Sequence, residues 1–272
     1  MTEILSTYPA VAWLALLATG VLIGLLAGLL GVGGGVVAVP VLLELFLHMG
    51  MIEATAVPLA VGTAQASILI ASLTAAWAHW RRGTIDRPLV IAWLPALIAG
   101  TLAGLVLGAW APARTLTIIF AAVAAFLALK MALGDRLVLT RARLAGPIAQ
   151  APPLAVGMLA AAVGVGAGTL STPVLSLFDF PIKRAVGAGA LFNLIVALPA
   201  TVTLLVLGLG APGRPPDAVG NVAVACMLAL AIPALFVAPL AARWSTRAPV
   251  PLLRALFALC LAAIALRLLL RL

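Results

Sequence analysis

Charged residues are scarce in this sequence: Asp, Glu, Lys and Arg make up only 8% of its 272 residues, whereas 65% are hydrophobic. So little polar surface cannot cover the core of a soluble domain, which excludes that class of protein. Histidine and cysteine are scarce too, with two of each, and both cysteines, Cys226 and Cys260, lie inside apolar runs. These numbers argue against a disulfide framework, a metal site and a hydrolase, and there is no Ser/His/Asp set or cofactor motif. We therefore expect neither an enzyme nor a bound cofactor or metal.

Long apolar runs take the place of the missing polar residues. About 20 apolar residues cross a bilayer as a helix, whereas barrel strands alternate over about 10, so these runs predict an all-α integral membrane protein surrounded by lipid. The net charge of +9 does not indicate nucleic-acid binding, because the basic residues stand at the ends of the runs, as topology signals do. The runs span residues 10–30, 36–48, 54–79, 88–110, 114–134, 147–163, 169–180, 185–209, 219–242 and 251–270.

One motif occurs twice: a glycine cluster that interrupts an apolar stretch and is followed by a proline. The copies are Gly31–Pro40 and Gly164–Pro173. The run after each cluster gives only about 20 Å of helix, short of the ~30 Å hydrocarbon core. Each copy therefore predicts the turn of a broken helical hairpin, which a membrane tolerates only where protein or water surrounds the exposed backbone. The chain then divides into a membrane repeat at 1–134, a charged cytoplasmic linker at 135–146 and a second membrane repeat at 147–272.

The distribution of basic residues supports this topology. The stretch His79–Arg87 combines an aromatic residue, basic residues and a turn, which predicts a loop at the cytoplasmic interface. Lys183 and Arg184 lie on the same side only if residues 147–180 enter and leave on one face, and twelve of the sixteen Lys and Arg residues are then cytoplasmic. Each repeat has a hairpin plus three transmembrane helices, an odd number of segments, so the two repeats are inverted. A conventional count of eight spans also fits the hydropathy.

The glycine clusters offer a way to bind an anion without a basic side chain. Glycine lets the backbone approach a ligand closely, and a helix that begins just after the cluster presents unpaired N–H donors and the positive end of its dipole. Two such helix starts facing each other form an anion site, to which hydroxyls after the second cluster add donors. The alternative is close helix packing, which we assign to Gly24 with Gly28 and to Gly100, Gly104 and Gly108. The candidate ligands are Gly33, Gly34, Gly35, Gly166, Gly168, Thr169, Ser171 and Thr172.

Other polar residues stand inside the apolar runs. Gln65, with Thr63 two residues before it, and Asn193 occupy comparable places in the run after each hairpin. Their side chains either line a central cavity or form hydrogen bonds between helices. Glu44 and His48 are four residues apart and share a helix face, so this pair is a candidate for binding a coupling proton.

With these motifs the chain resembles the sulfite exporter TauE/SafE family of membrane transport proteins. The residues that carry the resemblance are Gly28–Gly35 with Pro40, His79–Asp86, Gly164–Pro173 and Ala185–Gly187. The resemblance implies an inner-membrane permease for small anions, typically sulfite, sulfonates or other oxidised sulfur compounds. The sequence departs from the family pattern at Ala167, where a full glycine run is expected, and at Val57 and Pro58, where small hydroxyl residues are common.

Together these features predict a multi-pass secondary transporter that moves a sulfur oxyanion across the inner membrane by alternating access between inverted repeats. The proton is a candidate coupling ion, no nucleic-acid partner is expected, and assembly into a homo-oligomer is left open. An anion channel that uses the same helix dipoles, or a non-transporting scaffold packed through its glycines, are the alternatives.

Overall fold

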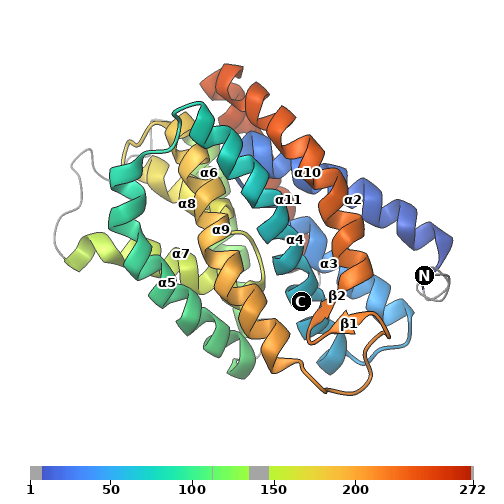
Figure 1. Cartoon of the computed structure of the whole chain (residues 1–272). Helices are drawn as coiled ribbons and strands as arrows, with labels where there is room; N and C mark the ends of the chain where they lie inside the picture. The colour runs from blue at the N-terminus through green and yellow to red at the C-terminus, as the bar shows by residue number, and fades with distance from the viewer. Residues whose placement is uncertain (1–7, 112, 135–146, 271–272) are drawn as a thin grey trace.

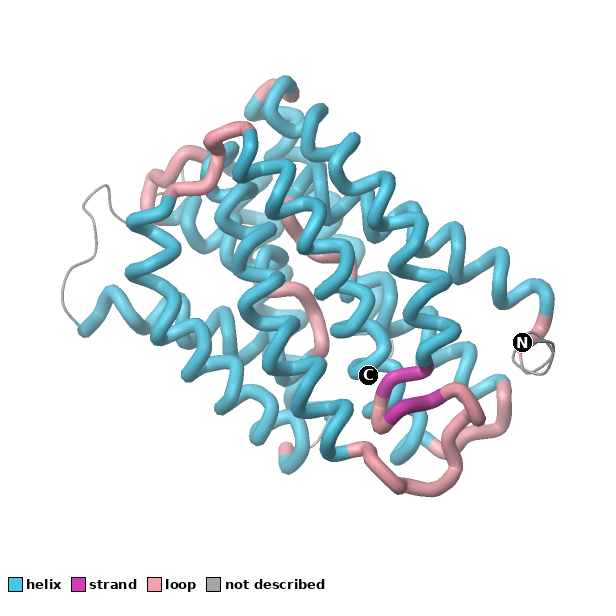
Figure 2. Tube along the Cα trace, in the orientation of Figure 1, coloured by secondary structure: helices cyan, strands magenta, loops and turns pink. Residues whose placement is uncertain are grey.

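The computed structural model describes residues 8–111, 113–134 and 147–270, and within them the fold is all-α apart from one small hairpin of strands (Figures 1 and 2). The predicted linker at 135–146 lies outside the described residues. The first half contains α2 (Ala10–Leu30), α3 (Gly35–His48), α4 (Glu53–Arg81), α5 (Arg87–Trp110) and α6 (Ala113–Leu133). The second half contains η2 (Pro147–Gln150), α7 (Ala151–Val163), α8 (Gly168–Leu177), α9 (Ile182–Leu207), β1 (Ala218–Val219), β2 (Val222–Ala223), α10 (Val224–Arg247) and α11 (Val250–Leu269).

Helix length separates spanning helices from short ones. Among the described residues, six helices are long and apolar enough to cross a membrane: α2, α4, α5, α9, α10 and α11. By contrast, α3 has 14 residues and α8 has 10, which gives them lengths of only about 21 and 15 Å. The prediction of an all-α, multi-pass membrane protein is confirmed, and a short helix follows each glycine cluster.

The two halves pack against each other in a reciprocal pattern. The first helix of each half lies along the fourth helix of the other half: α2 along α10, and α7 along α5 (Figure 1). The third helices, α4 and α9, contact each other, and so do the fifth helices, α6 and α11. Glycine permits the close approach, as predicted, because a Cβ on Gly28 would overlap the carbonyl oxygen of Ala238 and one on Gly104 would overlap that of Met158. Exchanging the halves therefore leaves the main helix contacts unchanged.

Basic loops gather on one face of the protein. The Arg184 guanidinium lies 3.6 Å from the Asp86 carboxylate. Lys183 Nζ donates a hydrogen bond of 2.8 Å to a backbone carbonyl at the end of α10. Partial burial and the neighbouring Arg243 lower the pKa of Arg82. Residues that follow α8 therefore lie beside the loop between α4 and α5, as the hairpin prediction requires.

The hairpin of strands corrects one boundary of the sequence analysis, which expected a continuous apolar helix from residue 219. Ala218 pairs with Ala223 and Val219 with Val222, and α10 begins only at Val224. Figure 2 shows the strands at one end of the helix bundle, next to the loop that follows α9. Gly220, with φ of 57°, makes the tight turn between the strands, which the apolar pattern does not reveal.

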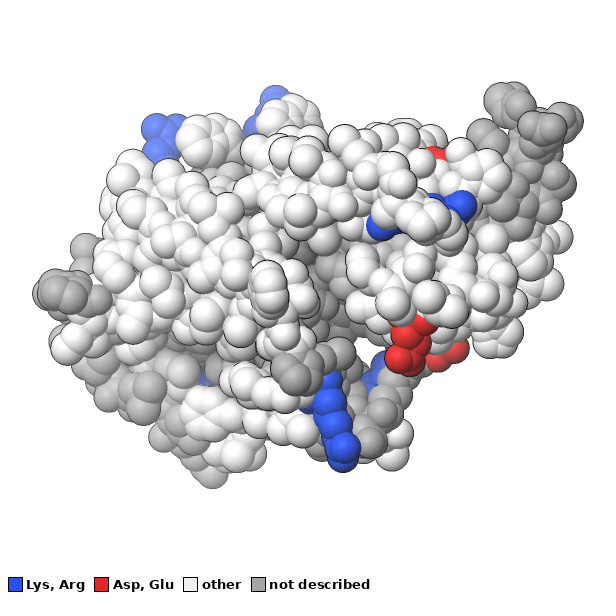
Figure 3. Space-filling model, turned by 90° about the horizontal axis from the view of Figure 1, so that it is seen from below, with Lys and Arg blue, Asp and Glu red and all other residues white. Residues whose placement is uncertain are grey.

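Seen from below, the molecule shows only scattered charged side chains (Figure 3).

Candidate functional site

The two glycine clusters form loops that cross each other inside the protein. Gly31 caps the end of α2 and Gly164 caps the end of α7, and both glycines adopt the left-handed conformation, with φ of 67° and 78°. The chain turns there and starts a short helix within a few residues, at Gly35 in one half and at Gly168 in the other. We call residues 31–35 and 164–168 together the loop crossing.

Backbone meets backbone at the loop crossing, which leaves no room for a side chain. A Cβ on Gly168 would overlap the carbonyl oxygen of Gly31, and a Cβ on Gly35 would lie 2.8 Å from the carbonyl oxygen of Gly164. The two contacts are counterparts of each other in the two halves. Glycine is required here for direct contact between the loops as well as for turning the chain.

Asn193 of α9 joins the two loops by hydrogen bonds. Its Oδ1 accepts from the N–H of Gly168 at 2.7 Å, and its Nδ2 donates to the carbonyl of Gly31 at 2.7 Å. Thr169 adds a third link, because its hydroxyl donates to the carbonyl of Val32 at 3.1 Å. Asn193 is buried, so its amide satisfies backbone groups that glycine alone would leave without partners. The crossing is therefore a hydrogen-bonded joint between the two halves.

The positive ends of two helices meet at this joint. α3 begins after Gly34 without a side-chain cap, so the first N–H groups of that helix point toward the crossing with their partial positive charge. α8 begins at Gly168, whose N–H is already held by Asn193. The two helix starts thus differ: Asn193 of α9 accepts from the first N–H of α8, whereas no side chain among the described residues accepts from the first N–H of α3.

Gln65 lies on the face of α4 that packs against the loop crossing, and its amide has no partner among the described residues. Val61 and Ile68, one turn before and after it, lie 2.7 Å and 2.6 Å from the positions of a Cβ on Gly164 and on Gly35. Gln65 shares their helix face, is fully buried, and neither of its amide atoms finds a hydrogen-bond partner in the part of the chain that is described. A buried amide without partners is unfavourable by about 1–3 kcal/mol, which points to a ligand.

Comparison with known proteins places the chain in a family of membrane transport proteins. The family model described as "Sulfite exporter TauE/SafE" matches residues 16–268 and includes both loops of the crossing. The chain belongs to this family. The TauE/SafE protein described here is 29% identical over 257 residues to a "Probable membrane transporter protein" of Haemophilus influenzae, a match that covers 94% of this chain and 97% of the relative. No solved structure matches the chain. The family and this similarity identify the chain as a membrane transporter.

The other predicted site residues of this TauE/SafE protein have structural partners in several cases. The hydroxyl oxygen of Thr63 accepts a hydrogen bond of 2.9 Å from the N–H of Ala223, which holds the strand hairpin against α4. The Thr172 hydroxyl donates to the carbonyl of Ala185 at 3.2 Å. Ser171 is buried, and its hydroxyl has no partner among the described residues. Gly33, Gly34 and Gly166 lie within the crossing, whereas Thr63 serves another contact.

The structure places the predicted proton pair, Glu44 and His48, in the last turn of α3, and the pair stays a prediction. His48 is exposed at the last residue of α3, with its Nδ1 2.9 Å from the backbone carbonyl of Glu44. The short helix has already left the crossing at this point. Gln65 and Asn193 do not occupy equivalent positions in the two halves. In the second half Asn193 accepts a hydrogen bond from Gly168, whereas in the first half the residue that packs on the equivalent Gly35 is Ile68.

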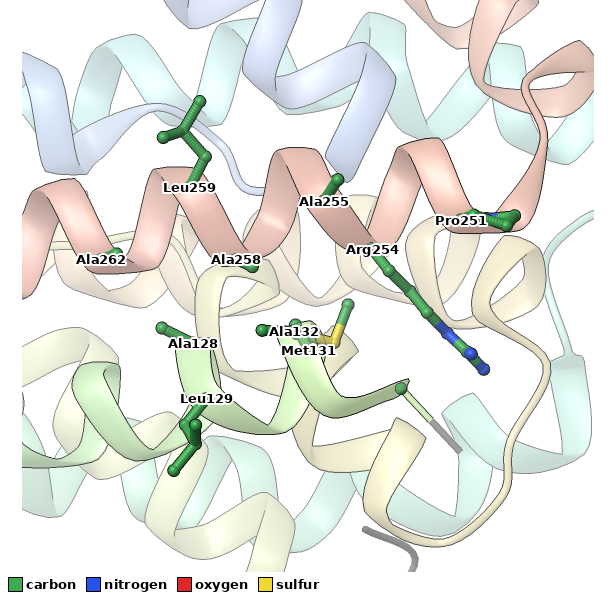
Figure 4. A pocket seen from close by; sticks show the side chains of 11 residues that line it. Ala128, Leu129, Met131, Ala132, Pro251, Arg254, Ala255, Ala258, Leu259 and Ala262 are labelled. Carbon is green, nitrogen blue, oxygen red and sulfur yellow. The ribbon is translucent and has the colours of Figure 1, made fainter. Parts of the chain in front are cut away.

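Two cavities lie away from the loop crossing. One, of about 800 Å³, is lined by alanines of α6 and α11 and by Arg254 (Figure 4). The other, of about 540 Å³, lies between residues 49–55 and the loop at 212–216. Neither is lined by a residue predicted for the site.

Sequence reasoning missed the buried imidazole of His79 because the surrounding stretch has the composition of an interface loop. His79 is fully buried and contacts the backbone of α2. A signal was present in the sequence, since this histidine is one of only two in the chain.

Proposed function

We propose that this TauE/SafE protein is a secondary transporter for a small anion and that the anion binds at the loop crossing. The observation that carries the proposal is the buried amide of Gln65, which has no partner among the described residues and lies on the face of α4 that packs against the crossing through Val61 and Ile68. The amide N–H₂ and the backbone N–H groups are donors, and the helix dipole supplies partial positive charge. The combination suits an oxyanion.

The site we propose binds without a basic side chain. Among the described residues, the side chains nearest to the glycines of the crossing are those of Ile23, Val61, Ile68 and Asn193. Neutral donors hold an anion less tightly than a guanidinium does, and a transporter must release its substrate on the far side. Gly33, Gly34, Gly35 and Gly166 let the backbone approach the ligand, and Ser171 offers a further free hydroxyl.

Alternating access follows from the reciprocal packing of the halves. The exchange pattern of helix contacts supports two inverted repeats, divided at 134 and 147, that rock about the crossing. In the present conformation Asn193 and Thr169 tie the loops together. We propose that an oxygen of the substrate replaces Asn193 Oδ1 at the Gly168 N–H during transport, so that the two loops separate.

The substrate class comes from the family. We infer a sulfur oxyanion, either sulfite or an organosulfonate, because the family carries the name sulfite exporter and the proposed site offers several convergent N–H donors but no cation. The inner membrane is the proposed location, with the basic loops on the cytoplasmic face.

The experiment is transport into proteoliposomes with labelled sulfite, thiosulfate, sulfoacetate, sulfolactate and sulfate, with and without a pH gradient. We expect saturable uptake of at least one sulfur anion, which Gly34→Val and Gly168→Val abolish while membrane insertion is retained. Gly50→Val is the matched control, because Gly50 has a positive φ as Gly34 does, but no atom lies within 4 Å of a Cβ there. Normal transport by both loop variants would refute the site, and conductance far above carrier turnover would indicate a channel.

A further inference from the structure

His79 lies where the cytoplasmic end of α4 meets α2, and both of its ring nitrogens have partners. Nε2 is 3.1 Å from the carbonyl oxygen of Gly28, and Nδ1 is 3.0 Å from the hydroxyl oxygen of Thr84. The side chain is fully buried. An ionisable group buried in a membrane protein is a functional candidate by default, and this one plays no part in the site proposed above.

The carbonyl of Gly28 fixes one proton of the ring. α2 ends two residues later, and the N–H of Val32, which would pair with this carbonyl in a longer helix, bonds Leu26 instead. The carbonyl can only accept, so the nitrogen opposite it must donate. Nε2 therefore carries a proton in every charge state, and Nδ1 is the position that gains or loses one.

Thr84 can accompany a change of charge at Nδ1 by rotating one hydroxyl. Its oxygen lies 3.0 Å from Nδ1 and 3.1 Å from the backbone carbonyl of His79. When Nδ1 is bare, the hydroxyl donates to it, and when Nδ1 is protonated, the hydroxyl accepts from it and donates to the carbonyl. That carbonyl also receives the N–H groups of Arg82 and Thr84, so it keeps a partner in both cases. Both charge states are hydrogen bonded without movement of heavy atoms.

His79 and Thr84 contact α2 and α9, the two helices that meet at the hydrogen bond between Gly31 and Asn193. Gly28 precedes Gly31 by one turn of α2, and Gly31 accepts from Asn193. Thr84 packs on Gly187 of α9, where a Cβ would lie 2.8 Å from its hydroxyl oxygen. Gly187 is on the helix that carries Asn193. A change of charge at His79 therefore acts on α2 and α9 close to their hydrogen-bonded joint.

The charged groups near His79 lie on elements other than α2, so α2 acts on the proton of His79 through its backbone alone. Arg82 follows in the same loop, Arg243 and Arg247 of α10 lie near Arg82, and Arg184 of α9 pairs with Asp86. α2 contributes no ionisable side chain. The carbonyl end of α2 is the element that faces the ring and stabilises an imidazolium, so moving α2 changes the stability of the charged form.

We propose that His79 binds, at Nδ1, the proton that is coupled to anion movement. The coupling rests on the transport function proposed above, whereas the proton site itself does not. The exposed His48 of the sequence-based prediction serves as the matched control.

Proton binding is tested directly by nitrogen NMR on protein labelled at histidine. In the His48→Gln variant, His79 is the single imidazole of the chain, so its two ring signals need no assignment. We expect the Nε2–H tautomer at high pH and a second protonation on acidification between about pH 9 and 4. Thr84→Val should shift this protonation, because it removes the hydroxyl that serves both states. A ring that stays in one protonation state over the whole range overturns the proposal.

Coupling is tested by transport of labelled sulfite in proteoliposomes. A gradient of about one pH unit drives up to about tenfold accumulation when one proton moves with each anion. His79→Gln keeps an N–H donor for Gly28 but cannot bind the proton, so we expect accumulation to fall to about onefold while exchange at equal pH continues. His48→Gln should accumulate like the wild type.

The outcomes separate this proposal from the function it rests on. Equal loss of accumulation and exchange in His79→Gln means that the residue is only structural, and unchanged accumulation means that the proton binds elsewhere. Both results overturn the coupling. If the wild type exchanges no anion of the panel, the transport proposal and the coupling fall together, and the NMR titration still decides whether His79 is a proton site.

Discussion

Gly168→Ala is the smallest change that tests the loop crossing. Gly168 is the first residue of α8, and a Cβ there would overlap the carbonyl oxygen of Gly31. The atom in the way belongs to the backbone of the other loop, so no side-chain rotation relieves the overlap. The two loops must move apart, which stretches the bond from the Gly168 N–H to Asn193 and the bond from Thr169 to Val32.

The magnitude follows from these contacts. Overpacking of a close-packed site destabilises by about 1–3 kcal/mol. Asn193 makes two hydrogen bonds and Thr169 one at the crossing, and polar interactions between membrane helices average about 0.6 kcal/mol each. Losing the two stretched bonds adds about 1 kcal/mol, so we expect Gly168→Ala to lower the free energy of unfolding by about 2–4 kcal/mol.

Unfolding of the purified protein in detergent, followed through its six tryptophans, measures this change. Gly50→Ala is the control, because φ of 83° strains an alanine there while no atom lies within 4 Å of its Cβ. Left-handed strain amounts to about 1–2 kcal/mol, so the control should be the milder variant. A Gly168→Ala protein that is as stable as Gly50→Ala, and that still exchanges anions, would refute direct contact between the loops.

Three further changes probe the surroundings of the crossing. Gln65→Leu removes the amide that has no partner among the described residues, so we expect the KM for the anion to rise about tenfold, which corresponds to the loss of roughly one hydrogen bond, without loss of stability. Ser72→Ala is the control, because Ser72 is a second such group on α4 and its loss should leave KM unchanged. An unaltered KM in Gln65→Leu would remove Gln65 from the site. Asn193→Asp keeps an acceptor for Gly168 but sets a carboxylate against the carbonyl of Gly31, so its exchange rate should fall further than that of Asn193→Leu, and the reverse order would contradict the bridge. Burial, the neighbouring Cys226 and the 2.8 Å hydrogen bond to Asp217 raise the pKa of Tyr8 above its ordinary value; stability from this group is therefore complete below about pH 10 and declines above it, and the absorbance of this single tyrosine should show no reversible ionisation near pH 10 in the folded protein.

The helices could be predicted because membrane burial imposes a simple rule on the sequence. An apolar stretch long enough to cross lipid must be helical, and glycine with a following proline interrupts it visibly. The ends of α2 and α7 at Gly31 and Gly164 follow from this rule, as does the return of the chain to the basic face before Lys183. The four-residue spacing of the glycines in α2 and α5 likewise predicts the close packing of these helices.

What the sequence could not reveal are the partners of single polar groups. Asn193 and Gln65 look alike in the sequence, yet Asn193 bridges two loops and Gln65 has no partner in the part of the chain that is described. Thr63 seats a hairpin of strands too short to show a pattern of its own. His79 lies next to basic and aromatic residues that mark the interface, which hides its contact with α2. Such roles depend on which residues from distant segments meet, and neither periodicity nor composition records that.

The difference between the two helix starts determines how the proposed site works. In the second half, Asn193 occupies the Gly168 N–H and Thr169 ties α8 to the first loop, so the donors of that half are already engaged. In the first half, apolar Ile68 packs against Gly35 in the corresponding place, and no side chain among the described residues accepts from the start of α3. In the mechanism that we propose, an anion meets the donors of α3 first and reaches those of α8 only when the bridge formed by Asn193 opens. On this basis, substitutions near α3 should change the affinity for the anion, and substitutions at Asn193 or Thr169 should change the rate at which the two halves exchange conformations.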